Sequence, residues 1–144
     1  MRPSLRVRQA ANWANLSTPA GLLLAAVSRT RTGKGPGGLI LATGYGLPLP
    51  KAAAFTVGNV VLCRVDRDTL KSHPRLLAHE ARHSTQYACC LGLPFFPLYA
   101  ACALYSQWRT GNPGTANVFE RLAGLADGGY PRPAPTQKRK AFSP

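Results

Sequence analysis

Two histidines separated by three residues, with a glutamate directly after the first, occur in the run His79-Glu80-Ala81-Arg82-His83. The surrounding residues alternate between apolar and polar at helical spacing, which predicts a helix here. On a helix, His79 and His83 lie about 40° apart and one turn apart, so both imidazoles can bind one metal ion. Glu80 lies beside that face, where its carboxylate can activate a water as a general base. The alternative is a solvated helix with no metal.

A catalytic zinc ion keeps three protein ligands and one open position, so a third ligand must come from elsewhere in the chain. Of the five acidic residues, Glu80 is assigned, two precede the histidine helix in a loop, and one lies at a helix end beside a glycine pair. Glu120 remains, in a predicted helix whose apolar neighbours would turn its carboxylate inward. We therefore predict Zn²⁺ bound by His79, His83 and Glu120.

Other polar residues near these positions are candidates for supporting roles. Gln86 and Tyr87 follow His79 and Glu80 by seven positions and extend the same helix face. We expect these two, with Asn117, to hydrogen-bond the ligands or a substrate. The alternative is that they are half-buried helix residues. Two tyrosines on predicted loops, Tyr45 and Tyr130, are candidate oxyanion donors.

The elements that must position these residues are predicted from periodicity and from capping residues. The expected order is a helix over 17–29, a loop over 30–38, paired strands over 39–43 and 55–64, a helix that begins near 69 or at 72–74 and ends near 90, a helix over 97–108, and a last helix from 115 or 117 to the glycine pair 128–129. This order predicts one small α+β domain over 15–130. We expect a short β-hairpin or two-stranded sheet, about four helices, and the histidine helix at the centre.

The two ends of the chain are basic. Residues 1–14 are predicted to be a flexible basic arm, and residues 131–144 a disordered, basic, proline-rich tail. These assignments rest on composition, because neither end has enough apolar surface to offset the entropy of ordering.

The arrangement resembles the gluzincin branch of the zincin metallopeptidases, and the short minigluzincins in size. It also resembles small bacterial proteins with the pattern HExRHxxQY, then LGLPF, then NxFExxAGLxxGGY, here residues 79–87, 91–95 and 117–130. The resemblance covers residues 15–130. It implies a zincin-like fold, zinc on His79, His83 and Glu120, Glu80 as general base, and a peptide or protein as substrate, lying extended along the strand 55–64.

The charge of the chain points to anionic partners. Its 144 residues include 18 Lys plus Arg and five Asp plus Glu, a formal net charge of +13. The alternative to an enzyme is therefore an inactive basic protein that binds a membrane surface or nucleic acid. Nucleic acid is the less favoured partner, because aromatic residues do not alternate with the basic ones.

No charged residue occurs between Arg82 and Arg109. A membrane span through this stretch would place Glu120 on the opposite side from the histidines, which a shared metal site excludes. Shallow insertion of residues 94–108 into an anionic membrane surface, helped by the basic termini, is compatible with the site. The alternative is a helix in the protein core. Four cysteines without a disulfide framework favour a cytoplasmic protein, peripheral at the inner face of the membrane if it binds lipid.

Overall fold

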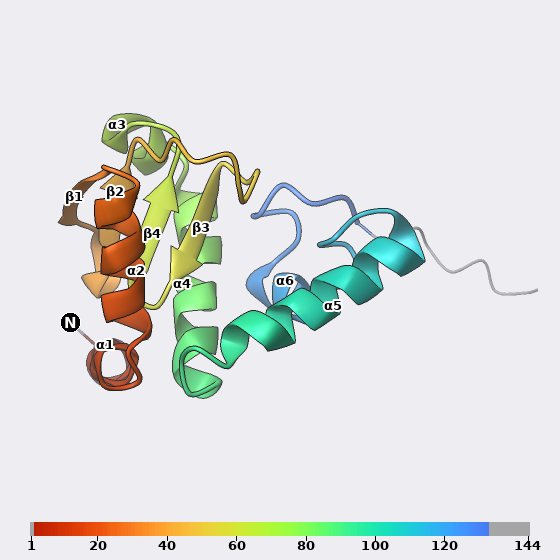
Figure 1. Ribbon diagram of the computed structural model, residues 1–144, viewed down its shortest axis with the longest axis horizontal. Helices are drawn as coiled ribbons and strands as arrows, with labels where there is room; N and C mark the ends of the chain where they lie inside the picture. Colours follow the sequence, from red (N-terminus) through yellow and green to blue (C-terminus); the bar gives the residue numbers. More distant parts are fainter. Residues whose placement is uncertain (1, 133–144) are drawn as a thin grey trace, which may run out of the picture.

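The computed structural model describes residues 2–132 and confirms an α+β fold (Figure 1). The helices are α1 (Pro3–Ala14), α2 (Ser17–Val27), α3 (Arg67–Lys71), α4 (Pro74–Cys89), α5 (Phe95–Thr110) and α6 (Val118–Ala123), with a short 3-10 helix at Pro36–Gly38. The strands are β1 (Arg31–Lys34), β2 (Ile40–Thr43), β3 (Ala54–Val57) and β4 (Val60–Cys63). From residue 133 on, the predicted tail lies outside the described residues.

The sheet has four strands in the order β1-β2-β4-β3, where two were expected. The stretch 55–64, predicted as one strand, is a tight hairpin, because Gly58 adopts a φ of +62° and, with Asn59, reverses the chain between Val57 and Val60. The predicted loop 30–38 contains β1, which pairs antiparallel with β2. The hairpin makes β4 run antiparallel to β3. β4 also pairs with β2, and these two strands are parallel, with Ile40 opposite Val60.

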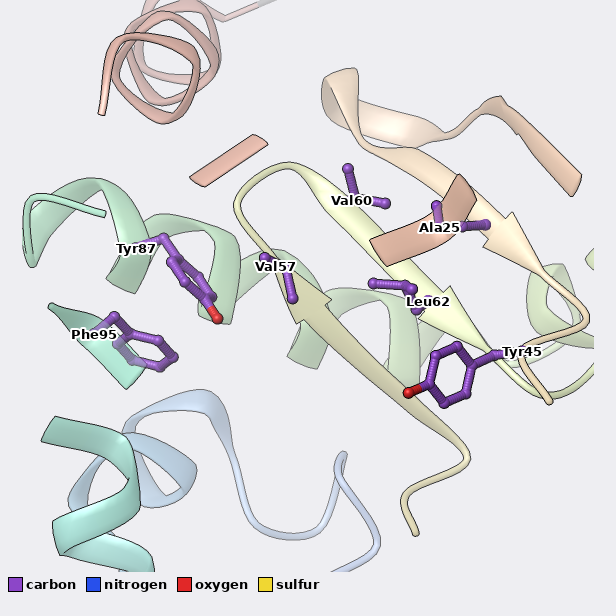
Figure 2. Close-up of a cluster of buried hydrophobic side chains, with 8 residues drawn as sticks. Ala25, Tyr45, Val57, Val60, Leu62, Tyr87 and Phe95 are labelled. Carbon is purple, nitrogen blue, oxygen red and sulfur yellow. The ribbon is translucent and has the colours of Figure 1, made fainter. Parts of the chain in front are cut away.

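The sheet lies between two helical layers, with α2 on one face and α4 on the other (Figure 1). The central strand β4 is fully buried and its side chains alternate between the two faces. Val60 and Leu62 pack with Ala25 of α2, as Figure 2 shows, whereas Val61 and Cys63 pack with Leu70 of α3 and Leu77 of α4. This core fixes α4, and therefore its histidines, against β3.

The amino-terminal segment differs from the expectation of a flexible arm, because residues 3–14 form α1. Asn12 is fully buried and donates hydrogen bonds to Asn59 Oδ1 at 3.0 Å and to the Ser84 carbonyl at 2.9 Å. Arg8 is also buried and donates to the Gly37 carbonyl at 2.5 Å. These partners lie far away in sequence, so the basic composition of the segment gives no sign of them.

Helix α5 extends away from the sheet, and α6 packs beside it (Figure 1). Helix α5 begins two residues before the predicted range 97–108 and ends two residues after it. Within the described part of the chain, no helix has the length and apolar character needed to cross a membrane. The four cysteines are free thiols, and only Cys63 among them is fully buried.

Candidate metal centre

The two histidines of α4 point the same way from a buried helix face. The predicted helix is confirmed, and it begins at Pro74, where the ring suits the first helical position. His79 and His83 are one turn apart, and their ring centroids lie 4.6 Å apart. Both side chains are buried, His79 almost completely.

Glu120 reaches the histidines from α6. Asn117 is the N-cap of this short helix, and its side-chain oxygen accepts a hydrogen bond from the Phe119 amide at 3.0 Å. Glu120 is therefore at the third helical position, where a glutamate often bonds back to the N-cap amide. Here the Asn117 amide instead donates to the Gly114 carbonyl, so the Glu120 carboxylate is available to the imidazoles.

The three side chains form a compact donor triangle. The Nε2 atoms of His79 and His83 are 3.0 Å apart, and Glu120 Oε2 lies 3.0 Å from the first and 3.4 Å from the second. A tetrahedral ion bound at about 2.0–2.1 Å separates its ligand atoms by about 3.3 Å, which is close to these spacings. His79, His83 and Glu120 thus form a group that could hold a metal ion.

Hydrogen bonds on the far side of each ring leave the Nε2 atoms free for the centre. His79 Nδ1 lies 3.0 Å from the carbonyls of Ala123 and Gly124, so it carries the proton in the neutral ring. His83 Nδ1 lies 2.8 Å from Gln86 Oε1, and the Gln86 amide donates to the Phe119 carbonyl at 2.9 Å. The oriented Gln86 oxygen therefore selects the same tautomer in His83.

The two Glu120 oxygens have different surroundings. Oε1 accepts a hydrogen bond from the Tyr99 hydroxyl, and the Tyr130 hydroxyl lies 3.4 Å away. Oε2 is buried, and no hydrogen-bond donor is directed at it. This unpaired oxygen is the one that faces the imidazoles.

The electrostatics favour a charged Glu120. Burial alone would raise the pKa of Glu120, but its interactions with the two imidazoles and with Tyr99 hold it below its ordinary value. Burial and the Glu120 charge raise the pKa of Tyr130 to about 12, and they raise that of Tyr99 further, so both hydroxyls remain donors. Burial alone would lower the pKa of His79, but the nearby Glu120 and Glu80 carboxylates raise it.

Glu80 lies beside the triangle and not in it. Its side chain is buried, and Thr56 of β3 donates a hydrogen bond to Glu80 Oε2 at 2.6 Å. Burial raises the pKa of Glu80, against the smaller lowering effects of His83 and Thr56. A carboxylate with a raised pKa beside a possible metal position is suited to accept a proton at neutral pH.

The segment after α6 covers His79. A Cβ built on Gly128 would lie 2.5 Å from His79 Cε1, so only glycine fits against the ring in this arrangement. Arg82 holds the segment in place, since it donates to the Ala123 carbonyl and to Asp127 Oδ2, the latter at 3.0 Å.

The triangle and Glu80 open into a pocket of about 480 Å³. One wall is the stretch 50–56, which includes β3 at the free edge of the sheet. The opposite wall is aromatic and includes Phe95, Phe96 and Tyr99 of α5. Tyr87 also lines the pocket, and its ring packs on Phe95 with centroids 4.3 Å apart (Figure 2).

The structure brings most of the sequence-predicted site residues together. Gln86 contacts His83 directly, whereas the Asn117 side chain caps α6 and forms its hydrogen bond with the Phe119 amide and not with a proposed ligand. Of the two candidate oxyanion donors, Tyr130 is at the pocket, while the Tyr45 ring packs in the core and its hydroxyl donates to the Leu49 carbonyl. Sequence reasoning misses Tyr99 and Thr56, whose roles come from contacts between distant segments.

Comparisons of this chain with protein-family models, with curated proteins and with solved structures found no match. The function is therefore inferred from the site itself.

Proposed function

We propose that this protein is a zinc-dependent metallopeptidase with His79, His83 and Glu120 as metal ligands and Glu80 as general base. The observation that carries the proposal is the donor triangle with spacings of 3.0–3.4 Å, placed beside a buried carboxylate at the base of a pocket. The resemblance of the sequence to gluzincins supports the same assignment.

The donor chemistry favours zinc. Two imidazoles and one carboxylate leave a fourth tetrahedral position open, the arrangement typical of catalytic zinc. The group contains no cysteine and only one residue with an oxygen donor, whereas calcium and magnesium prefer several oxygen ligands. When bound there, zinc would polarise a substrate carbonyl and make a water molecule more acidic.

The residues of the chain supply the remaining functions. Glu80 accepts the proton of the attacking water and delivers it to the leaving amine, and Thr56 holds the Glu80 carboxylate in position. The free edge of β3 offers unpaired backbone groups to an extended peptide. The apolar wall formed by Phe95 and Phe96 favours a substrate with a large apolar side chain next to the cleaved bond.

The test combines zinc content with turnover. We expect the wild-type protein to retain one zinc ion per chain and to cleave members of a broad peptide library at neutral pH. Glu80→Gln should keep the zinc and lose turnover, because the amide cannot accept the proton. Thr85→Ala, which changes an exposed hydroxyl of the same helix, is the matched control and should leave both properties unchanged.

A wild-type protein that holds a full complement of zinc and cleaves no peptide in the library would contradict the peptidase proposal. The protein would then be a zinc-binding protein without peptidase activity. Loss of zinc in Glu80→Gln would show instead that Glu80 is a ligand, against its assignment as a base.

A further inference from the structure

The outward face of α5 is apolar and exposed over most of its length. The residues Leu98, Ala101, Tyr105 and Trp108 recur every three or four positions and so share one face, with Leu104 beside them. Leu104 is 72% exposed and Trp108 81%, whereas Leu98 and Tyr105 are each 49% exposed. Of the 16 residues of α5, only Phe95 and Ser106 are buried.

Within the described residues, nothing covers this face. The opposite side of the same helix makes the contacts with the rest of the protein, where Phe95 and Tyr99 pack on Phe119 of α6. A contiguous exposed face of this kind indicates a surface that docks on something else.

The distribution of charge selects an anionic partner. Every acidic residue of the chain is placed away from this face: Glu80 and Glu120 are buried in the metal centre, and Asp127 is paired with Arg82. The other two lie at α3, at the opposite end of α4 from α5 (Figure 1). An exposed cation adjoins the face instead, Arg109 in the last turn of α5.

We propose that α5 docks on an anionic lipid bilayer, with its axis in the plane of the membrane surface. Leu98, Leu104 and the neighbouring apolar groups enter the boundary between headgroups and acyl chains. Tyr105 and Trp108, whose rings lie 6.2 Å apart, occupy the headgroup level that such amphipathic rings prefer. Arg109 and the net charge of +13 add attraction to anionic headgroups.

The test is flotation of the whole protein with lipid vesicles. We expect binding to vesicles of phosphatidylcholine mixed with phosphatidylserine, weaker binding to phosphatidylcholine alone, and a decrease with added salt. The double variant Leu104→Gln/Trp108→Gln should reduce the partition coefficient by about tenfold or more, because it removes two large apolar side chains from the contact.

The matched control is Leu23→Gln/Val27→Gln on α2, where both side chains are 66% exposed. This variant changes the same kind of surface on another helix and should partition within about twofold of the wild type, since these residues lie outside the proposed contact. Zinc content and circular dichroism of both variants show whether each is folded.

The proposal would be overturned by no flotation of the wild type with the anionic vesicles, by equal binding to both lipid compositions, or by an equal loss in the control variant. A dimer in solution that the Leu104→Gln/Trp108→Gln variant dissociates would show that α5 docks on a second copy of the chain and not on lipid.

Discussion

Single side chains behind the ligands determine where the ligand atoms point. The Tyr99 hydroxyl holds Glu120 Oε1, and this leaves Oε2 facing the two imidazoles. Gln86 orients the His83 ring through its contact with Nδ1, which leaves Nε2 facing the candidate metal position. Contacts of this kind reduce the number of orientations that the ligands must give up when an ion binds.

Tyr99→Phe should weaken zinc binding by about tenfold, because it removes the hydroxyl that orients Glu120. Competition with a fluorescent chelator measures the Kd. Tyr105→Phe, on the exposed side of the same helix, is the control and should bind zinc as the wild type does. An unchanged Kd in Tyr99→Phe would show that Glu120 is positioned without this contact.

Gly128→Ala should both destabilise the protein, by about 1–3 kcal/mol, and weaken zinc binding. The new methyl group would meet the His79 ring at 2.5 Å, and the ring cannot move without leaving the Ala123 and Gly124 carbonyls. Thermal unfolding with and without zinc measures both effects. Gly46→Ala is the control, because its Cβ would have no neighbour within 4 Å, and a similar loss there would refute the steric explanation.

Among the secondary-structure elements, the short helix α6 is the one that presents Glu120 to the candidate site. It has only six residues, so its N-cap contributes a large share of its order. Asp66 caps α3 in the same way, with side-chain bonds to the amides of Asp68 and Thr69, and it does not line the pocket of the candidate metal centre.

Asn117→Ala should cost about 1 kcal/mol of stability and also weaken zinc binding, because it loosens the turn that presents Glu120. The Asp66→Ala variant should lose the N-cap of α3 and keep the zinc affinity of the wild type. Urea unfolding and zinc competition on the two variants separate these effects. Equal zinc affinity in both variants would mean that α6 does not depend on its cap to present Glu120.

The sequence predicts the elements that have strong local signals. The helix with both histidines is recognised from its periodicity and from Pro74, and Glu120 from the small number of acidic residues. The hairpin within 55–64 is missed because the apolar run predicts one strand, although its two turn residues, Gly58 and Asn59, form a pair typical of tight hairpin turns. The contacts of Tyr99 and Thr56 join residues more than 20 positions apart, and no local pattern encodes them.

For the molecule as a whole, the titratable groups of the candidate metal centre should make stability depend on pH. The pKa of His79 and that of Glu80 are both raised in the folded protein, above ordinary values of 6.5 and 4.5. A group whose pKa is higher in the folded than in the unfolded protein stabilises the fold fully at pH values below its pKa in the unfolded protein. This contribution is lost as the pH rises through its pKa in the folded protein. Glu120, whose pKa is lowered, has the opposite effect, but only below 4.5.

The metal-free protein should therefore lose stability as the pH rises from 4.5 to beyond 6.5. In excess zinc the stability should instead increase with pH over this range, because protons compete with the metal for the imidazoles and the carboxylate. Urea unfolding across this range, in chelator and in excess zinc, measures both slopes. A metal-free protein that gains stability over the same range would contradict the assigned environments of His79 and Glu80.

The most direct test of the metal centre is X-ray absorption at the zinc edge of the zinc-loaded protein. We expect nitrogen and oxygen ligands at about 2.0–2.1 Å, with the outer-shell scattering of two imidazoles and no sulfur. Sulfur at about 2.3 Å, or fewer than two imidazoles, would show that zinc binds elsewhere and would contradict the site formed by His79, His83 and Glu120.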